Sequence, residues 1–258
     1  MATDYAALAR TLTDALGLAS PPIAVCLTDT VPPGVPAWEG RAPAGCAFWE
    51  HAARGAFVTS PRDHDLCAIG TFTHNLPTTP AHEADRGDAL QVFADLGYVK
   101  PEDIPLIPTL RERHRHVVYA PLADTPLSPD VVLLFVRADQ ALVLAEASES
   151  LDRGQPPAMG RPACAVIPQA RNSERAALSL GCCGARAYLD TLSDGIALYA
   201  IPGARLAEYV ERVDTLGRAN RVLATFHRLR RHDVEAGARP TINESLARLE
   251  KARLEAAG

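Results

Sequence analysis

The chain has 258 residues, 47% of them hydrophobic and 22% charged, with a formal net charge of −5. This composition predicts a globular protein with a sizeable core and excludes a disordered chain. The small negative charge favours neither a nucleic-acid partner nor an anionic membrane surface. The first ten residues lack the pattern of a secretory signal, and the longest apolar run, 131–136, is too short to span a bilayer. We therefore expect a cytoplasmic protein.

The N-terminal half is predicted to mix helices with short buried strands. Apolar residues recur at helical spacing over 4–17, and Ser20-Pro-Pro22 ends that helix. The Pro- and Gly-rich stretch 31–43 predicts a loop. Further helices are expected from near Cys46 to about Gly55 and over 87–97, and strands over 23–27, 57–59 and 116–122.

The C-terminal half contains the most apolar strand, 131–136, and Asp139 is expected to cap a helix that runs to about Ala147. A second strand is predicted over 196–201, and a long amphipathic helix from Arg205. Thr241 and Glu244 have the spacing of a capping box, which predicts a final helix over 241–258. The fold class is therefore mixed, α/β or α+β.

Four of the six cysteines fall into two similar segments, Cys46 to Cys67 and Cys164 to Cys182. Each segment opens with a cysteine, crosses a polar stretch and an apolar run, and closes with a cysteine shortly before a glycine. A similar apolar strand precedes each segment. We therefore expect one globular domain over 1–240, built from two similar halves (about 18–125 and 126–202) packed about a pseudo-twofold axis, with 241–258 as a C-terminal helical extension.

Clustered cysteines in a reducing compartment favour metal binding or catalysis over disulfides. The four cysteines lack the tight Cys-x-x-Cys spacing of zinc ribbons, so buried thiols that act as small hydrophobic residues remain an alternative. Cys182 lies in a glycine-flanked turn at a predicted helix start, where free N–H groups stabilise a thiolate and bond cluster sulfides. Gly181 and Gly184 are therefore candidate cofactor-binding residues. Cys26 and Cys183 are not expected to be ligands.

Three polar residues near these cysteines are weaker candidates for a catalytic role. Arg186 is one helical turn after Cys182 and could hold an anionic substrate or form a structural ion pair. His51 follows Cys46 on a predicted helix, and His64 precedes Cys67 in a polar loop. Either histidine could transfer protons or contact a ligand of the metal, and either could equally be an ordinary histidine.

Over about Ala6 to Val213 the sequence resembles the uncharacterised prokaryotic proteins of domain of unknown function family 169. The motifs that carry the resemblance include Pro22-Ile-Ala-Val25, Cys67-Ala-Ile-Gly70, Ala120-Pro-Leu122, 130–134 with Gln140-Ala141, Cys46, Cys164 and the Gly-Cys-x-Gly-x-Arg pattern at Gly181–Arg186. The resemblance implies that the four cysteine positions matter, consistent with an iron–sulfur cluster. It implies no reaction, and Cys26 and Cys183 depart from the family pattern.

We expect an iron–sulfur protein whose cluster, most simply [4Fe–4S], is bound by Cys46, Cys67, Cys164 and Cys182. Its expected partners are a small-molecule substrate, which the protein would reduce, and an electron donor. We expect neither a nucleic acid nor a membrane as a partner, and the protein could form a homo-oligomer. Three alternatives use the same residues: a zinc-stabilised binding or regulatory protein, an enzyme with Cys182 as nucleophile, and a scaffold with buried thiols.

Overall fold

The computed structural model describes residues 3–255, and a mixed sheet forms its framework. The strands are ordered β2-β3-β1-β4-β7-β6-β5 across this sheet. Neighbouring strands are antiparallel except β5 and β6, which are parallel. The strand bounds are β1 (Ile23–Thr28), β2 (Phe57–Thr59), β3 (His116–Pro121), β4 (Val131–Arg137), β5 (Ala158–Met159), β6 (Ala177–Ser179) and β7 (Ile196–Pro202).

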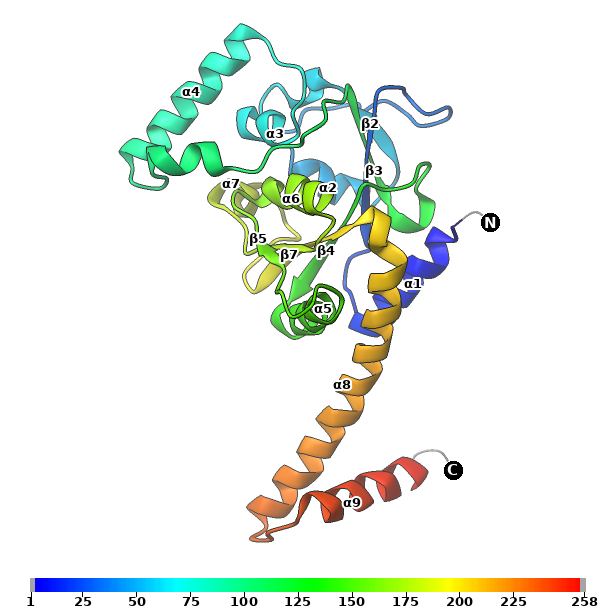
Figure 1. Ribbon diagram of the computed structural model, residues 1–258. Helices are drawn as coiled ribbons and strands as arrows, with labels where there is room; N and C mark the ends of the chain where they lie inside the picture. The colour runs from blue at the N-terminus through cyan, green and yellow to red at the C-terminus, as the bar shows by residue number, and fades with distance from the viewer. Residues whose placement is uncertain (1–2, 256–258) are drawn as a thin grey trace.

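The helices lie on both faces of the sheet (Figure 1). Their bounds are α1 (Tyr5–Leu16), α2 (Ala47–Ala52), α3 (Ala68–Thr73), α4 (Pro80–Asp95), α5 (Ala138–Leu151), α6 (Val166–Ser173), α7 (Cys183–Tyr188), α8 (Leu206–Glu235) and α9 (Ile242–Glu255). Short 3-10 helices connect several of them, among them η1 (Pro61–His64), η2 (Pro101–Leu106) and η4 (Ala163–Ala165).

The alternation of side chains along the strands divides the core into two clusters, one on each face. In β1, Ile23 and Val25 belong to the cluster covered by α2, α6 and α7, which we call the cysteine face. Ala24 and Cys26 belong to the cluster covered by α1, α5 and α8, which we call the helix face. Cys26 is therefore separated from the other cysteines by the thickness of the sheet.

The structure confirms the mixed α/β class and the C-terminal helix. The strand predicted over 57–59 agrees in its bounds with β2. α4 begins at Pro80, earlier than predicted, because the side chain of Thr79 caps it and proline suits the first turn. The prediction that Asp139 caps α5 is wrong. Arg137 is the N-cap, and its N–H donates to the Gln140 side chain.

The order of strands is the same on either side of the central β1–β4 pair, since β1 is followed by β3 and β2, and β4 by β7 and β6. The two sides also differ. β5 extends the sheet beyond β6 only, and α4 with η2 occurs only in the segment between β2 and β3. The pseudo-twofold relation of the halves therefore stays a prediction.

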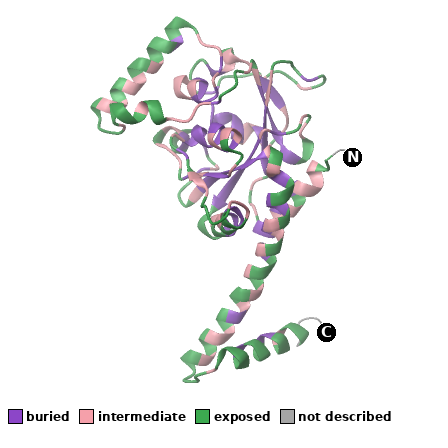
Figure 2. Cartoon of the chain, viewed as in Figure 1, coloured by how far each residue is buried: buried purple, intermediate pink, exposed green. Residues whose placement is uncertain are grey.

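α8 projects away from the sheet, and α9 turns back beside its far end (Figure 1). α9 ends at Glu255, and the last part of the predicted helix, 256–258, lies outside the described residues. The far part of α8, α9 and α4 are mostly exposed, whereas the buried residues concentrate at the sheet (Figure 2). Between residues 3 and 255, none of the helices is apolar and long enough to cross a membrane.

Candidate functional site

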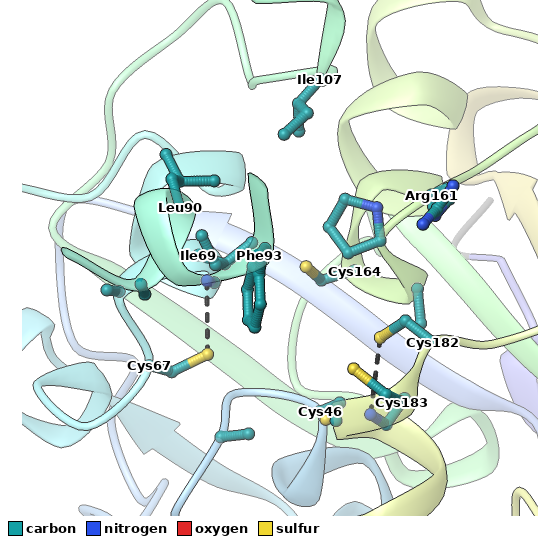
Figure 3. A pocket seen from close by; sticks show the side chains of 18 of the residues that line it. Cys46, Cys67, Ile69, Leu90, Phe93, Ile107, Arg161, Cys164, Cys182 and Cys183 are labelled. Carbon is teal, nitrogen blue, oxygen red and sulfur yellow. Dashed lines mark hydrogen bonds between the residues drawn. The ribbon is translucent and has the colours of Figure 1, made fainter. Parts of the chain in front are cut away.

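A pocket of about 900 Å³ opens on the cysteine face, between the segment that contains α3, α4 and η2 and the segments around η4 and α7. Cys46, Cys67, Cys164 and Cys182 all line it, together with Cys183. Figure 3 shows that Cys46, Cys67, Cys164 and Cys182 come from four separate segments of the chain and surround a common space. The fold thus brings together the four cysteines that the two sequence segments predicted.

Each of the four cysteines stands at the start of a helix. Cys46, Cys67 and Cys182 are the N-cap residues of α2, α3 and α7, and Cys164 lies in η4, directly before α6. Cys67 Sγ accepts a hydrogen bond from the Gly70 N–H at 3.3 Å, and Cys182 Sγ accepts one from Ala185 at 3.5 Å (dashed in Figure 3). N–H donors stabilise negative charge on a sulfur atom, so these positions suit thiolates.

Gly70 is required next to Cys67 for a steric reason. A Cβ atom at position 70 would lie only 2.6 Å from Cys67 Sγ, closer than carbon and sulfur can approach. Glycine therefore permits both the close approach of the sulfur and its hydrogen bond to the backbone. This explains physically why a glycine follows this cysteine by three residues.

The four thiols are close enough to influence each other's ionisation. Each of the six possible pairs interacts electrostatically, and a negative charge on one thiol opposes a charge on the next. Burial, with a smaller contribution from the neighbouring thiols, raises the pKa of Cys46 to about 12. Burial also raises the pKa values of Cys67 and Cys164, the latter well above its usual range. Protonated thiols are therefore favoured until a cation offsets the repulsion.

The four cysteines line one pocket, but they do not form a compact site for a single metal ion. Among residues 3–255, no three Cys, His, Asp or Glu side chains are close enough together to hold a single metal ion. Any group bound by all four sulfurs in this arrangement must be larger than one ion. Metal ligation by the four cysteines stays a prediction.

His64 lies near Cys67, fully buried, with a lone pair that has no partner. The Thr59 hydroxyl donates to the Val117 carbonyl, so it must accept from His64 Nε2–H at 3.1 Å. His64 Nδ1 is therefore unprotonated, and no described residue bonds to it. A Cβ atom at Gly45 would lie 3.3 Å from His64 Nδ1 and 3.8 Å from Cys67 Sγ, which places the imidazole beside this cysteine.

A second buried histidine, His74, has a similar arrangement. Its Nδ1–H donates to the Gly70 carbonyl at 2.9 Å, which leaves Nε2 buried and without a partner among the described residues. Burial lowers the pKa of His64 to about 3, with a smaller contribution from the neighbouring histidines, and burial lowers that of His74 to about 4. Both imidazoles are neutral at physiological pH.

Tyr119 is a residue at this site that the sequence did not indicate. It lies on β3, fully buried, and its ring stacks on Phe48 at 5.5 Å. Its hydroxyl has no hydrogen-bond partner among the described residues, and it interacts electrostatically with Cys67, Cys164 and Cys46. Burial, with a smaller contribution from these thiols, raises its pKa well above the usual value. Strand alternation could have placed Tyr119 beside Val117 on one face, but not beneath the cysteines.

The other predicted site residues are dispersed. Arg186 does not line the pocket. Its guanidinium donates to four backbone carbonyls, those of Leu180, Leu192, Ser193 and Ile196. The half-exposed His51 packs against Trp38, with ring centres 4.8 Å apart, and also lies outside the lining. Gly184 lines the pocket, whereas Gly181 shapes the preceding turn with a φ of +91°.

The fold and the site define a mixed α/β protein with a pocket lined by cysteines. The chain belongs to the DUF169 family, whose family model, described as an uncharacterised ArCR, matches residues 11–212. The match includes all four cysteines and ends within α8, before α9. No curated protein and no solved structure matches this chain.

Proposed function

We propose that this protein is an iron–sulfur oxidoreductase that binds a [4Fe–4S] cluster through Cys46, Cys67, Cys164 and Cys182. One observation carries the proposal: four thiols from four separate segments line one pocket, and every pair of them interacts. Hydrophobic packing alone gives no reason for four thiols, which repel one another when ionised, to line one pocket. Thiolates are the ligands that iron–sulfur clusters prefer.

The residues present fit a cluster better than they fit a zinc ion. The four sulfurs lie around a pocket, and no three of the described ligand-type side chains are close enough for one ion. A cluster is larger than an ion and also carries sulfide atoms, which accept hydrogen bonds. The buried Tyr119 hydroxyl is a donor without an acceptor beside these thiols, which is consistent with such a group. When bound, the cluster would supply electrons one at a time and, at an iron without a thiolate ligand, a Lewis acid.

The remainder of the pocket supports a small, largely apolar substrate. Ile69, Leu90, Phe93 and Ile107 line the same pocket as the sulfurs, and Ile69 and Leu90 lie beside Cys67 (Figure 3). Arg161 lies at the same pocket and stacks on Tyr98, 4.5 Å from the ring centre. A volume of about 900 Å³ lies within the range of about 300–1,000 Å³ found for small-molecule sites. We propose that the substrate is reduced there with electrons from a separate donor, in the cytoplasm.

The experiment is anaerobic purification followed by iron and sulfide analysis, visible absorption and electron paramagnetic resonance after reduction. The expected result is four irons and four sulfides for each chain, with a reducible chromophore. A colourless protein without iron and sulfide after anaerobic reconstitution would contradict the proposal. Stoichiometric zinc without sulfide would indicate the zinc-stabilised alternative.

The geometry of Cys182 supports a second candidate, an enzyme with a cysteine nucleophile. Cys182 is less buried than Cys46 and Cys164, lines the pocket, and accepts the Ala185 N–H. A hydrogen-bonded, accessible sulfur is suited to nucleophilic attack. Rapid alkylation at Cys182, mapped by mass spectrometry in protein that binds no metal, would support this candidate. Protection of Cys182 by bound iron and sulfide would exclude it.

A further inference from the structure

The hydroxyl of Tyr119 is one of several buried polar groups that have no partner among the described residues. It is enclosed on the cysteine face, and no hydrogen-bond partner exists for it among the described residues. A buried donor without an acceptor costs about 1–3 kcal/mol, and such groups are rare in folded proteins. A tyrosine in this position therefore calls for a hydrogen-bond acceptor that the described residues do not supply.

The neighbours of Tyr119 limit what its acceptor can be. The ring packs against Phe48 and Phe57, with ring centres 5.5 and 5.7 Å away, and neither side chain can accept a conventional hydrogen bond. Tyr119 belongs to the same core cluster as Cys46 and Cys164, and α2, which begins after Cys46, packs on β3. The thiols of Cys67, Cys164 and Cys46 also interact electrostatically with the hydroxyl. The acceptor must therefore be found at the four-cysteine site.

His64 cannot fill the role of donor at this site. Its ring packs against Phe48 with ring centres 4.8 Å apart, and the ring of Tyr119 packs against the same Phe48 at 5.5 Å. The single N–H of His64, however, is already bonded to Thr59. The free nitrogen of His64 only accepts. Tyr119 is thus the side chain beside the thiols with an O–H that remains unused.

We infer that Tyr119 is a positioning residue that donates its hydroxyl hydrogen bond to a sulfur of the bound cluster, either a ligating thiolate or a sulfide, and thereby raises the reduction potential. This inference rests on the proposed function. Reduction adds negative charge to the cluster, and a donor aimed at sulfur stabilises the reduced state more than the oxidised state. Removing the hydroxyl must then make reduction harder.

Tyr199 offers a matched control on the other side of the sheet. It is also fully buried, on β7, but its hydroxyl donates to the Leu144 carbonyl at 2.9 Å and also bonds Ser148. Tyr119→Phe and Tyr199→Phe therefore remove the same atom from two buried sites. The two sites differ in whether another residue of the protein forms a hydrogen bond with the tyrosine hydroxyl.

The first measurement is urea unfolding of the two variants without a cluster. Tyr119→Phe is expected to unfold at the same urea concentration as the parent protein or at a higher one, because no bond is lost. Tyr199→Phe is expected to unfold at a lower concentration. A Tyr119→Phe protein that is destabilised as much as Tyr199→Phe would overturn the inference, because the hydroxyl would then have a partner within the protein.

The second measurement is a potentiometric titration after anaerobic reconstitution. Tyr119→Phe is expected to shift the midpoint potential of the cluster to more negative values. The expected change is about tenfold in the equilibrium constant for reduction, which is about 59 mV for one electron. The potential of the Tyr199→Phe protein is expected to equal that of the parent protein. Clusters with equal potentials in the parent and Tyr119→Phe proteins, or equal shifts in both variants, overturn this inference alone. A parent protein that binds no iron and sulfide overturns the proposed function and this inference with it.

Discussion

The buried tyrosines on the two faces of the sheet differ in whether their hydroxyls are hydrogen-bonded. On the helix face, the Tyr199 hydroxyl bonds Ser148 and the Leu144 carbonyl, and the Tyr209 hydroxyl bonds Asp152, which also pairs with Arg205. On the cysteine face, the Tyr119 hydroxyl, His64 Nδ1 and His74 Nε2 are all buried and lack partners among the described residues.

The difference indicates which face was shaped by stability and which by binding. A buried network with every partner present stabilises the native fold. Unpartnered donors and acceptors destabilise it, and they are retained where a ligand completes them. The helix face therefore serves as the structural support for the site on the cysteine face. Each variant below tests this division, and the expected effects decrease in order.

The largest effect is expected from replacing a predicted ligand. Cys164→Ser should reduce bound iron and sulfide to background after anaerobic reconstitution, because serine is a poor ligand for the iron of a thiolate-bound cluster. Cys26→Ser is the control, since Cys26 lies on the helix face near Thr125, with 3.5 Å between Sγ and Oγ1. Full iron content in Cys164→Ser, or an equal loss in Cys26→Ser, would refute the division between the faces.

The next effect is a loss of stability in acid. The pKa values of His64 and His74 are lowered by burial to about 3 and about 4, so the unfolded chain binds more protons than the folded protein below pH 6.5. Stability that is present above pH 6.5 should therefore fall as the pH drops, by up to about 1.4 kcal/mol per pH unit for each histidine. Urea unfolding of the protein without metal at pH 7, 6 and 5 measures this.

The control for this pH dependence is a change in the histidines themselves. His64→Gln with His74→Gln should flatten the dependence between pH 7 and 5, whereas a change at the exposed His227 should leave it steep. Glutamine can still donate to Thr59, so the hydrogen bond at position 64 is retained. An unchanged pH dependence in the double variant would show that other groups cause the acid instability.

A smaller effect is expected at two tightly packed glycines, one on each face. In Gly70→Ala the new Cβ would lie 2.6 Å from Cys67 Sγ, so the sulfur must move and iron content should fall. In Gly217→Ala it would lie 2.8 Å from the Ala15 carbonyl oxygen, where α1 meets α8. We expect a cost of about 1–3 kcal/mol from overpacking there, without loss of iron. Iron analysis and urea unfolding measure the two effects. Loss of iron in Gly217→Ala, with full iron content in Gly70→Ala, would contradict the assignment of the faces.

The smallest effect is expected from removing residues 238–258. α9 packs on the far end of α8, partly through Leu249 and the Arg248–Asp233 ion pair. These contacts lie outside residues 11–212, the part that the family model matches. The shortened chain should keep its iron and sulfide content and lose only helicity, measured by circular dichroism. A shortened chain that folds but cannot be reconstituted would show that the extension contributes to the site.

Local signals in the sequence determined most of the elements. The run Val131–Val136 could only be a buried strand, and β4 covers it. Asp4 and Thr241 provide side-chain caps next to predicted helix starts, and both are bonded as caps. The sequence also indicated which four cysteines to consider together, and these four line one pocket. Helix starts were less reliable where, as at Arg137, a backbone N–H and a later side chain form the cap.

The tertiary structure alone decided which polar groups face the four cysteines. Strand alternation separates Val25 from Cys26 in β1, but it does not state which face receives the thiols. From the sequence, Arg186 could bind a substrate beside Cys182. In the structure its guanidinium is instead bonded to four backbone carbonyls, which tertiary packing brings around it. Nothing in the sequence distinguished Tyr119 from an ordinary strand residue, since its hydroxyl is buried without a partner only once α2 packs on β3. The sequence determines which donors and acceptors each side chain has. Whether each of them finds a hydrogen-bond partner depends on residues that are distant in the sequence and are brought close only by tertiary packing.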